Sequence, residues 1–85
     1  MRKQAYTTRT GKTQYKPVVS EAVYQRAEDD MDGFCLACGA TRGGCEPDAR
    51  KYPCESCGEA KVYGLPELLL MGLVVLTSSR RSLEN

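Results

Sequence analysis

The sequence predicts a small metal-stabilised α+β fold, and three observations support this prediction. The chain has 85 residues, of which 41% are hydrophobic and only 7% aromatic, so its core is too small to be stable without a staple or a partner. It contains five cysteines, four of them in two C-x-x-C pairs, and no histidine. A segment with helical features lies on either side of these pairs.

Residues 1–17 are polar and basic, and we interpret them as a flexible arm. The segment contains five of the twelve bases of the chain and no acidic residue, although the formal net charge of the whole chain is +1. Such an arm suits salt-sensitive contact with a nucleic-acid backbone; a solvated terminus without a partner is the alternative interpretation. The candidate nucleic-acid-binding residues are Arg2, Lys3, Arg9, Lys12 and Lys16.

Residues 18–33 are predicted to form an amphipathic helix. Ser20 is a suitable N-cap, Glu21 favours the positive first turn, and Gly33 is expected to close the far end. Apolar residues recur at roughly helical spacing, at Val19, Ala22, Val23, Ala27 and Met31.

Residues 34–64 contain two copies of the pattern C-x-x-C-G, and fifteen residues lie between Cys38 and Cys54. Two residues between the cysteines form a tight knuckle that directs both sulfurs at one ion, and the glycine that follows adopts a positive φ without strain. The spacing matches a four-cysteine zinc pattern, in which the sulfurs surround the ion tetrahedrally. The sequence therefore predicts a zinc ribbon whose knuckles lie on short β-hairpins. It predicts one structural Zn²⁺ per chain, bound by Cys35, Cys38, Cys54 and Cys57.

Two further residues of this segment are informative: a fifth cysteine and a proline. Cys45 is a fifth cysteine in the spacer, which we interpret as a free thiol at a loop tip; an alternative ligand or an intermolecular disulfide are the other interpretations. Pro53 precedes the second pair and cannot donate to a β-ladder, so its strand is expected at a sheet edge.

Residues 65–76 are predicted to form a short apolar helix, with Pro66 in its first turn and Gly72 at its end. The residues after Gly72 either continue the helix or extend as a strand. This segment is expected to pack on the first helix and the ribbon, or to form a homodimer or partner interface through Leu68, Leu69 and Met71. Residues 77–85 are predicted to be a polar tail.

The chain has no feature of a membrane or exported protein. Its most apolar segment is twelve residues long, whereas a membrane-spanning helix needs about 20, and no apolar stretch follows the charged start. We therefore expect a cytoplasmic protein without a membrane partner, where paired cysteines more often bind metal than form disulfides.

The stretch from Phe34 to Leu70 resembles a rubredoxin-like zinc ribbon. It is similar to the small zinc-ribbon proteins of bacteriophage and prophage genomes, through the stretches Cys35–Ala40, Glu46–Arg50, Tyr52–Gly58 and Val62–Gly64. The resemblance implies a fold and a bound metal, and a host-cell cytoplasm if a phage encodes the chain. It does not imply an activity.

The sequence predicts that the protein is not an enzyme. Without histidine it lacks the commonest general base, and four cysteines close the coordination sphere of a zinc ion. We expect a zinc-ribbon adaptor that binds nucleic acid or a nucleic-acid-handling protein. The alternatives are a phage-type interaction module that inhibits a host enzyme or defence complex, and rubredoxin-like electron transfer, since iron also accepts four thiolates.

Overall fold

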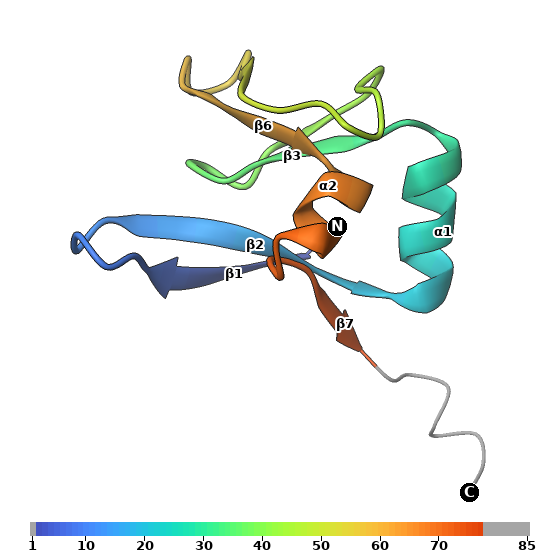
Figure 1. Ribbon diagram of the computed structural model, residues 1–85, viewed down its shortest axis with the longest axis horizontal. Helices are drawn as coiled ribbons and strands as arrows, with labels where there is room; N and C mark the ends of the chain where they lie inside the picture. The colour runs from blue at the N-terminus through green and yellow to red at the C-terminus, as the bar shows by residue number, and fades with distance from the viewer. Residues whose placement is uncertain (1, 78–85) are drawn as a thin grey trace, which may run out of the picture.

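The computed structural model describes residues 2–77, which form two small sheets and two helices (Figure 1). One sheet has the strand order β1-β2-β7 and the other the order β4-β3-β6-β5. The small α+β class predicted from the sequence is confirmed. The elements are β1 (Arg2–Thr7), β2 (Thr13–Ser20), α1 (Glu21–Asp29), β3 (Gly33–Cys35), β4 (Thr41–Arg42), β5 (Tyr52–Pro53), β6 (Ala60–Gly64), α2 (Leu65–Leu70) and β7 (Val75–Thr77).

The basic N-terminal segment is a β-hairpin, so the prediction of a flexible arm over residues 1–17 is wrong. β1 and β2 pair in antiparallel register from Arg2↔Val18 to Thr7↔Thr13. Between them the Thr8 N–H donates to the Lys12 carbonyl at 2.8 Å, and Gly11 takes a φ of +90°. The period-2 pattern of a half-buried strand is present only in β2, because β1 is exposed at nearly every position.

Helix α1 begins as predicted and ends differently. The Ser20 hydroxyl accepts the Val23 N–H at 3.2 Å, which confirms the N-cap. The helix is shorter than residues 18–33, because the residues before Ser20 belong to β2. It ends at Asp29, and Met31 rather than Gly33 closes its last turn: Met31 takes a φ of +58°, and its N–H donates to the Glu28 carbonyl. Gly33 instead opens β3.

Helix α2 ends at Leu70, and Gly72 closes its last turn, as predicted. Gly72 takes a φ of +76°, its N–H donates to the Leu69 carbonyl, and the next N–H donates to the Leu68 carbonyl at 2.9 Å. Val75–Thr77 then form β7, which pairs in parallel with the end of β2. Thr77, which was predicted to begin the polar tail, is therefore part of a strand. The rest of the predicted tail, residues 78–85, lies outside the described residues.

Both helices end in the same hydrogen-bonded turn, but one has methionine where the other has glycine. A left-handed φ destabilises a residue with a Cβ by about 1–2 kcal/mol relative to glycine. Part of this advantage of glycine is lost, because glycine has more conformational freedom in the unfolded chain. We expect Met31→Gly to be more stable than Met31→Ala by roughly 0.5–1 kcal/mol in denaturant unfolding. Met31→Ala is the matched control, because both variants lose the same side chain. Equal stabilities would contradict the prediction.

The main core lies between the two sheets, where α2 also sits (Figure 1). Leu65 and Leu68 of α2 are one turn apart and fully buried. Leu68 is therefore not part of an exposed interface, which corrects the prediction from the sequence. Leu69 and Met71 are 40% and 44% exposed. The buried members of this core are Ala27, Phe34, Leu36, Tyr63, Leu65 and Leu68.

Candidate metal centre

The two C-x-x-C-G segments have the same backbone geometry. The Gly39 N–H donates to the Cys35 carbonyl at 2.8 Å, and the Gly58 N–H donates to the Cys54 carbonyl at the same distance. The N–H of each first cysteine donates to the carbonyl five residues later at 2.9 Å. Gly39 and Gly58 both take a φ of +82°, the positive value expected from the sequence. Each segment therefore turns its two sulfurs towards the same side.

Each segment connects two antiparallel strands. β3 pairs with β4 around the first, and β5 pairs with β6 around the second. β3 also pairs with β6, through Phe34↔Tyr63 and Cys35↔Val62, and this central pairing brings the two segments together. Pro53 lies in β5 at the edge of the sheet, as its missing N–H requires.

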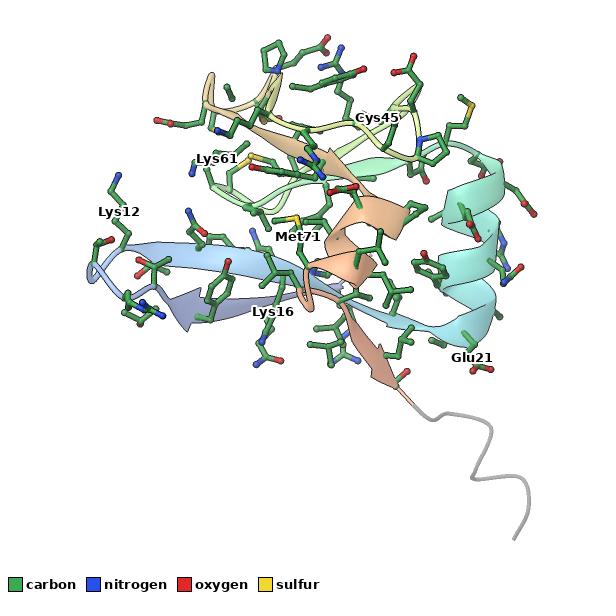
Figure 2. The ribbon with its side chains drawn as sticks, viewed as in Figure 1. Lys12, Lys16, Glu21, Cys45, Lys61 and Met71 are labelled. Atoms are coloured by element: carbon green, nitrogen blue, oxygen red, sulfur yellow. The ribbon has the colours of Figure 1, made fainter. Side chains whose placement is uncertain are left out.

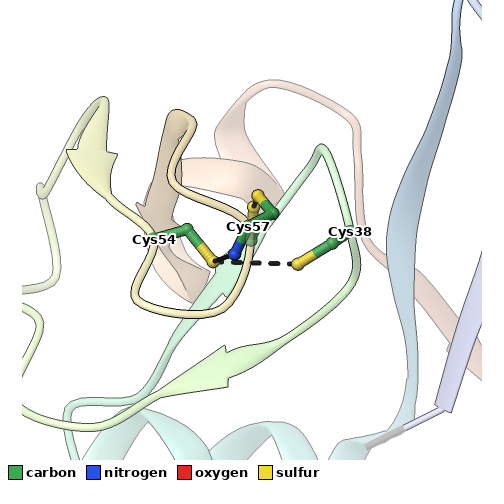
Figure 3. A group of neighbouring side chains, drawn as sticks. Cys38, Cys54 and Cys57 are labelled. Carbon is green, nitrogen blue, oxygen red and sulfur yellow. Dashed lines mark hydrogen bonds between the residues drawn. The ribbon is translucent and has the colours of Figure 1, made fainter.

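The four cysteine sulfurs form a compact group, and Figure 3 labels three of these cysteines, Cys38, Cys54 and Cys57. The Sγ atoms of Cys35 and Cys57 are 3.7 Å apart, as are those of Cys38 and Cys54, and all four lie within 4.8 Å of one another. A tetrahedron with metal–sulfur bonds of about 2.3 Å has edges of about 3.8 Å. A disulfide requires about 2.05 Å, so these cysteines are free thiols.

The surroundings of the sulfurs oppose ionisation of two of the four cysteines and favour it in a third. Burial raises the pKa of Cys35 to about 12 and raises that of Cys38. The backbone N–H groups of Cys57 and Ser56 lie 3.4 and 3.3 Å from the Cys54 sulfur, and mainly the former lowers the pKa of Cys54 to about 6. The Cys54 thiol is therefore the one that ionises readily. The positive charge of a bound divalent ion favours the thiolate form of the other ligands.

The four cysteines differ in their exposure to solvent. Cys35 is fully buried, Cys54 is 5% exposed, and Cys57 is exposed. Cys57 lines a cleft of about 350 Å³ together with Lys12 of the hairpin turn and Lys61 of β6. Because four protein sulfurs complete a tetrahedron, an ion held here has no open position for a substrate.

Cys45 lies apart from the four sulfurs and is not at an exposed loop tip. It is 1% exposed and packs against Cys35, Ala49 and Val62 in a second buried cluster. A Cβ on Gly33 would lie 2.6 Å from its sulfur. Burial raises the pKa of this thiol, so it is a small apolar residue of the interior. This corrects the interpretation made from the sequence.

The hairpin carries the five predicted nucleic-acid-binding residues, and the structure distributes them over different faces. Lys3 lies against the ribbon: its Nζ donates to the Cys38 carbonyl at 3.1 Å and lies 4.8 Å from the centroid of the Tyr15 ring. Arg2 and Lys16 belong to the opposite face of the hairpin, since they alternate with Lys3 and Tyr15. Arg9 and Lys12 lie in the turn. The contact of Lys3 with the first knuckle has no signal in the sequence.

No protein-family profile, curated protein or solved structure matches this chain. Within residues 2–77, no helix has the length and apolar character that crossing a membrane requires.

Proposed function

We propose that this protein is a structural zinc module of the zinc-ribbon type that acts as a non-enzymatic adaptor. The observation that carries the proposal is the approach of four sulfurs from two identical turns to tetrahedral spacing. Zinc suits this donor set, because it binds thiolates tetrahedrally and needs no vacant position when its role is structural. Such a site leaves the surfaces of the module to do the binding.

We propose nucleic acid as the partner of the adaptor. The hairpin presents five bases and no acidic residue over residues 1–17. It is held to the first knuckle by the Tyr15 N–H, which donates to the Leu36 carbonyl at 2.8 Å, and by the Lys3 contact with Cys38. The positive charges therefore sit on a docked, ordered element, which loses less conformational entropy on binding than a flexible arm would.

Binding of the zinc-loaded chain to labelled oligonucleotides across salt concentrations tests this function. We expect log Kd to rise linearly with log salt concentration, because each phosphate contact releases counterions; the slope is about 0.9 per contact on a duplex and about 0.7 on a single strand. Fluorescence anisotropy provides the measurement.

Absence of any oligonucleotide affinity at about 50 mM salt would contradict nucleic-acid binding. A protein partner would then be the remaining candidate, and the exposed end of α2 favours it. Leu70 is 84% exposed there, beside the partly exposed Leu69 and Met71.

A further inference from the structure

The β1-β2-β7 sheet has one covered face and one face on which nothing packs within residues 2–77. Alternate residues of the hairpin, Tyr15, Pro17 and Val19, face the interior, where Pro17 and Val19 are fully or almost fully buried. The residues between them face the other way, because successive side chains of a strand alternate between its two faces. This second face is the outer face of the sheet, and its hairpin residues are Arg2, Gln4, Tyr6, Gln14, Lys16 and Val18.

The outer face carries two basic side chains, and its strands contribute no acidic residue to it. Arg2 and Lys16 lie on it, and none of the three strands contains an aspartate or glutamate. The first knuckle of the metal centre lies on the other side of the hairpin, where Lys3 donates to the Cys38 carbonyl. A polyanion is therefore the partner whose charge complements this face.

Tyr6 gives the face an aromatic centre. The Lys16 Nζ lies 5.4 Å from the centroid of the Tyr6 ring, and the Tyr6 hydroxyl donates to Gln14 Oε1 at 2.9 Å. The side chain is thereby held in place, with an ammonium group beside an aromatic ring and the amides of Gln4 and Gln14 nearby. An ammonium group suits a phosphate, and an aromatic ring suits the face of an unpaired base.

The aromatic ring on the outer face distinguishes a single strand from a duplex. The bases of a duplex are stacked on one another and present only their edges in the grooves, so a protein ring finds no free base face there. Tyr6 lies on the face of the hairpin opposite to that of the buried Pro17 and Val19, so this one face is offered. A flat face suits a strand whose bases are unstacked.

We propose that the outer face of the β1-β2-β7 sheet binds single-stranded nucleic acid, with a base stacked on Tyr6 and phosphates at Lys16 and Arg2. This inference rests on the proposed function and specifies its surface and its ligand. It assigns a role to Tyr6. It also predicts that Lys16 contributes to binding and Lys12 does not, although the sequence gives no reason to distinguish the two lysines. Figure 2 shows these two lysines projecting from opposite sides of the hairpin.

The test compares single substitutions in the zinc-loaded full chain, using a labelled 20-nucleotide oligo-dT and a duplex of equal length. Lys16→Gln is expected to weaken oligo-dT binding and to lower the salt slope by about 0.7. Lys12→Gln, which removes the same charge from the other side, is the matched control and is expected to leave both unchanged. Tyr6→Leu is expected to weaken binding roughly tenfold, while Tyr6→Phe retains it.

Three outcomes would overturn the inference while leaving the proposed function intact: equal losses for Lys12→Gln and Lys16→Gln, full affinity in Tyr6→Leu, or a preference for the duplex. Failure of the unmodified chain to bind either oligonucleotide would instead overturn the proposed function itself. Zinc content and circular dichroism establish that each variant is folded. If Tyr6→Leu does not fold, the two lysine variants, whose side chains are not buried, still decide between the faces.

Discussion

Removal of the metal is expected to unfold the part of the protein around the cysteines. Apart from the cysteines themselves, the only buried members of the cluster beside the site, within residues 2–77, are Ala49 and Val62. Structural zinc contributes an apparent ~10–16 kcal/mol to small metal-dependent folds, which exceeds the total stability of many domains. A strong chelator, which can approach through the exposed Cys57, should therefore abolish the cooperative unfolding transition followed by circular dichroism.

Two cysteine variants show whether the four sulfurs are the ligands. Cys57→Ser is expected to lose both the metal and the ordered structure, although Cys57 is exposed and contributes little to the core. Cys45→Ala is the matched control, because Cys45 is buried but lies outside the group of four, and it should retain one zinc per chain. A folded, metal-free Cys57→Ser protein would contradict the structural role of zinc. A coloured protein with one iron per chain would favour electron transfer instead.

Gly64→Ala is expected to cost about 3 kcal/mol or more, through overlap with backbone atoms. Gly64 joins β6 to α2 and has a φ of −64°, which alanine also adopts. A Cβ at this position would lie 2.5 Å from the carbonyl oxygen of Glu46 and 2.6 Å from that of Pro47. Backbone cannot move aside as a flexible side chain does, so the spacer loop or α2 must shift. Thermal unfolding of the zinc-loaded protein measures the loss.

Gly43→Ala provides the comparison for Gly64→Ala. Gly43 is exposed in the same spacer, and the nearest atom to its added Cβ would be Asp32 Oδ1 at 3.8 Å. Its substitution is expected to change stability by less than about 0.5 kcal/mol. Equal stability of Gly64→Ala and Gly43→Ala would contradict the close approach of Gly64 to the spacer loop.

Elements with strong local signals were predicted well from the sequence. Ser20 and Gly72 act as caps within one turn of backbone, and Gly39 and Gly58 take the positive φ that each knuckle needs. Pro53 lies at a sheet edge because it lacks an N–H. In each case the interaction that decides the local structure involves only residues close in sequence to the one from which it was predicted.

The N-terminal hairpin was missed because its stability depends on a partner distant in sequence. Residues 2–7 have no apolar period, and in β2 the burial of Pro17 and the partial burial of Tyr15 depend on segments that pack on the strand from elsewhere in the chain. The prediction that Leu68 is part of an interface was wrong for the same reason. Leu68, Leu69 and Leu70 are chemically identical, so the sequence does not distinguish them, yet their exposure ranges from 0% to 84%.

The sequence by itself determined the candidate ligand set, because C-x-x-C-G is a local geometry that sets both sulfurs of a pair and the turn after them. Only the tertiary structure decided that the pairs meet at 3.7 Å, since this depends on β3 lying beside β6. It also decided which bases of the hairpin face the ribbon and which face outward. A strand shows its alternation in the sequence, but which side is covered depends on segments that pack on it from elsewhere in the chain.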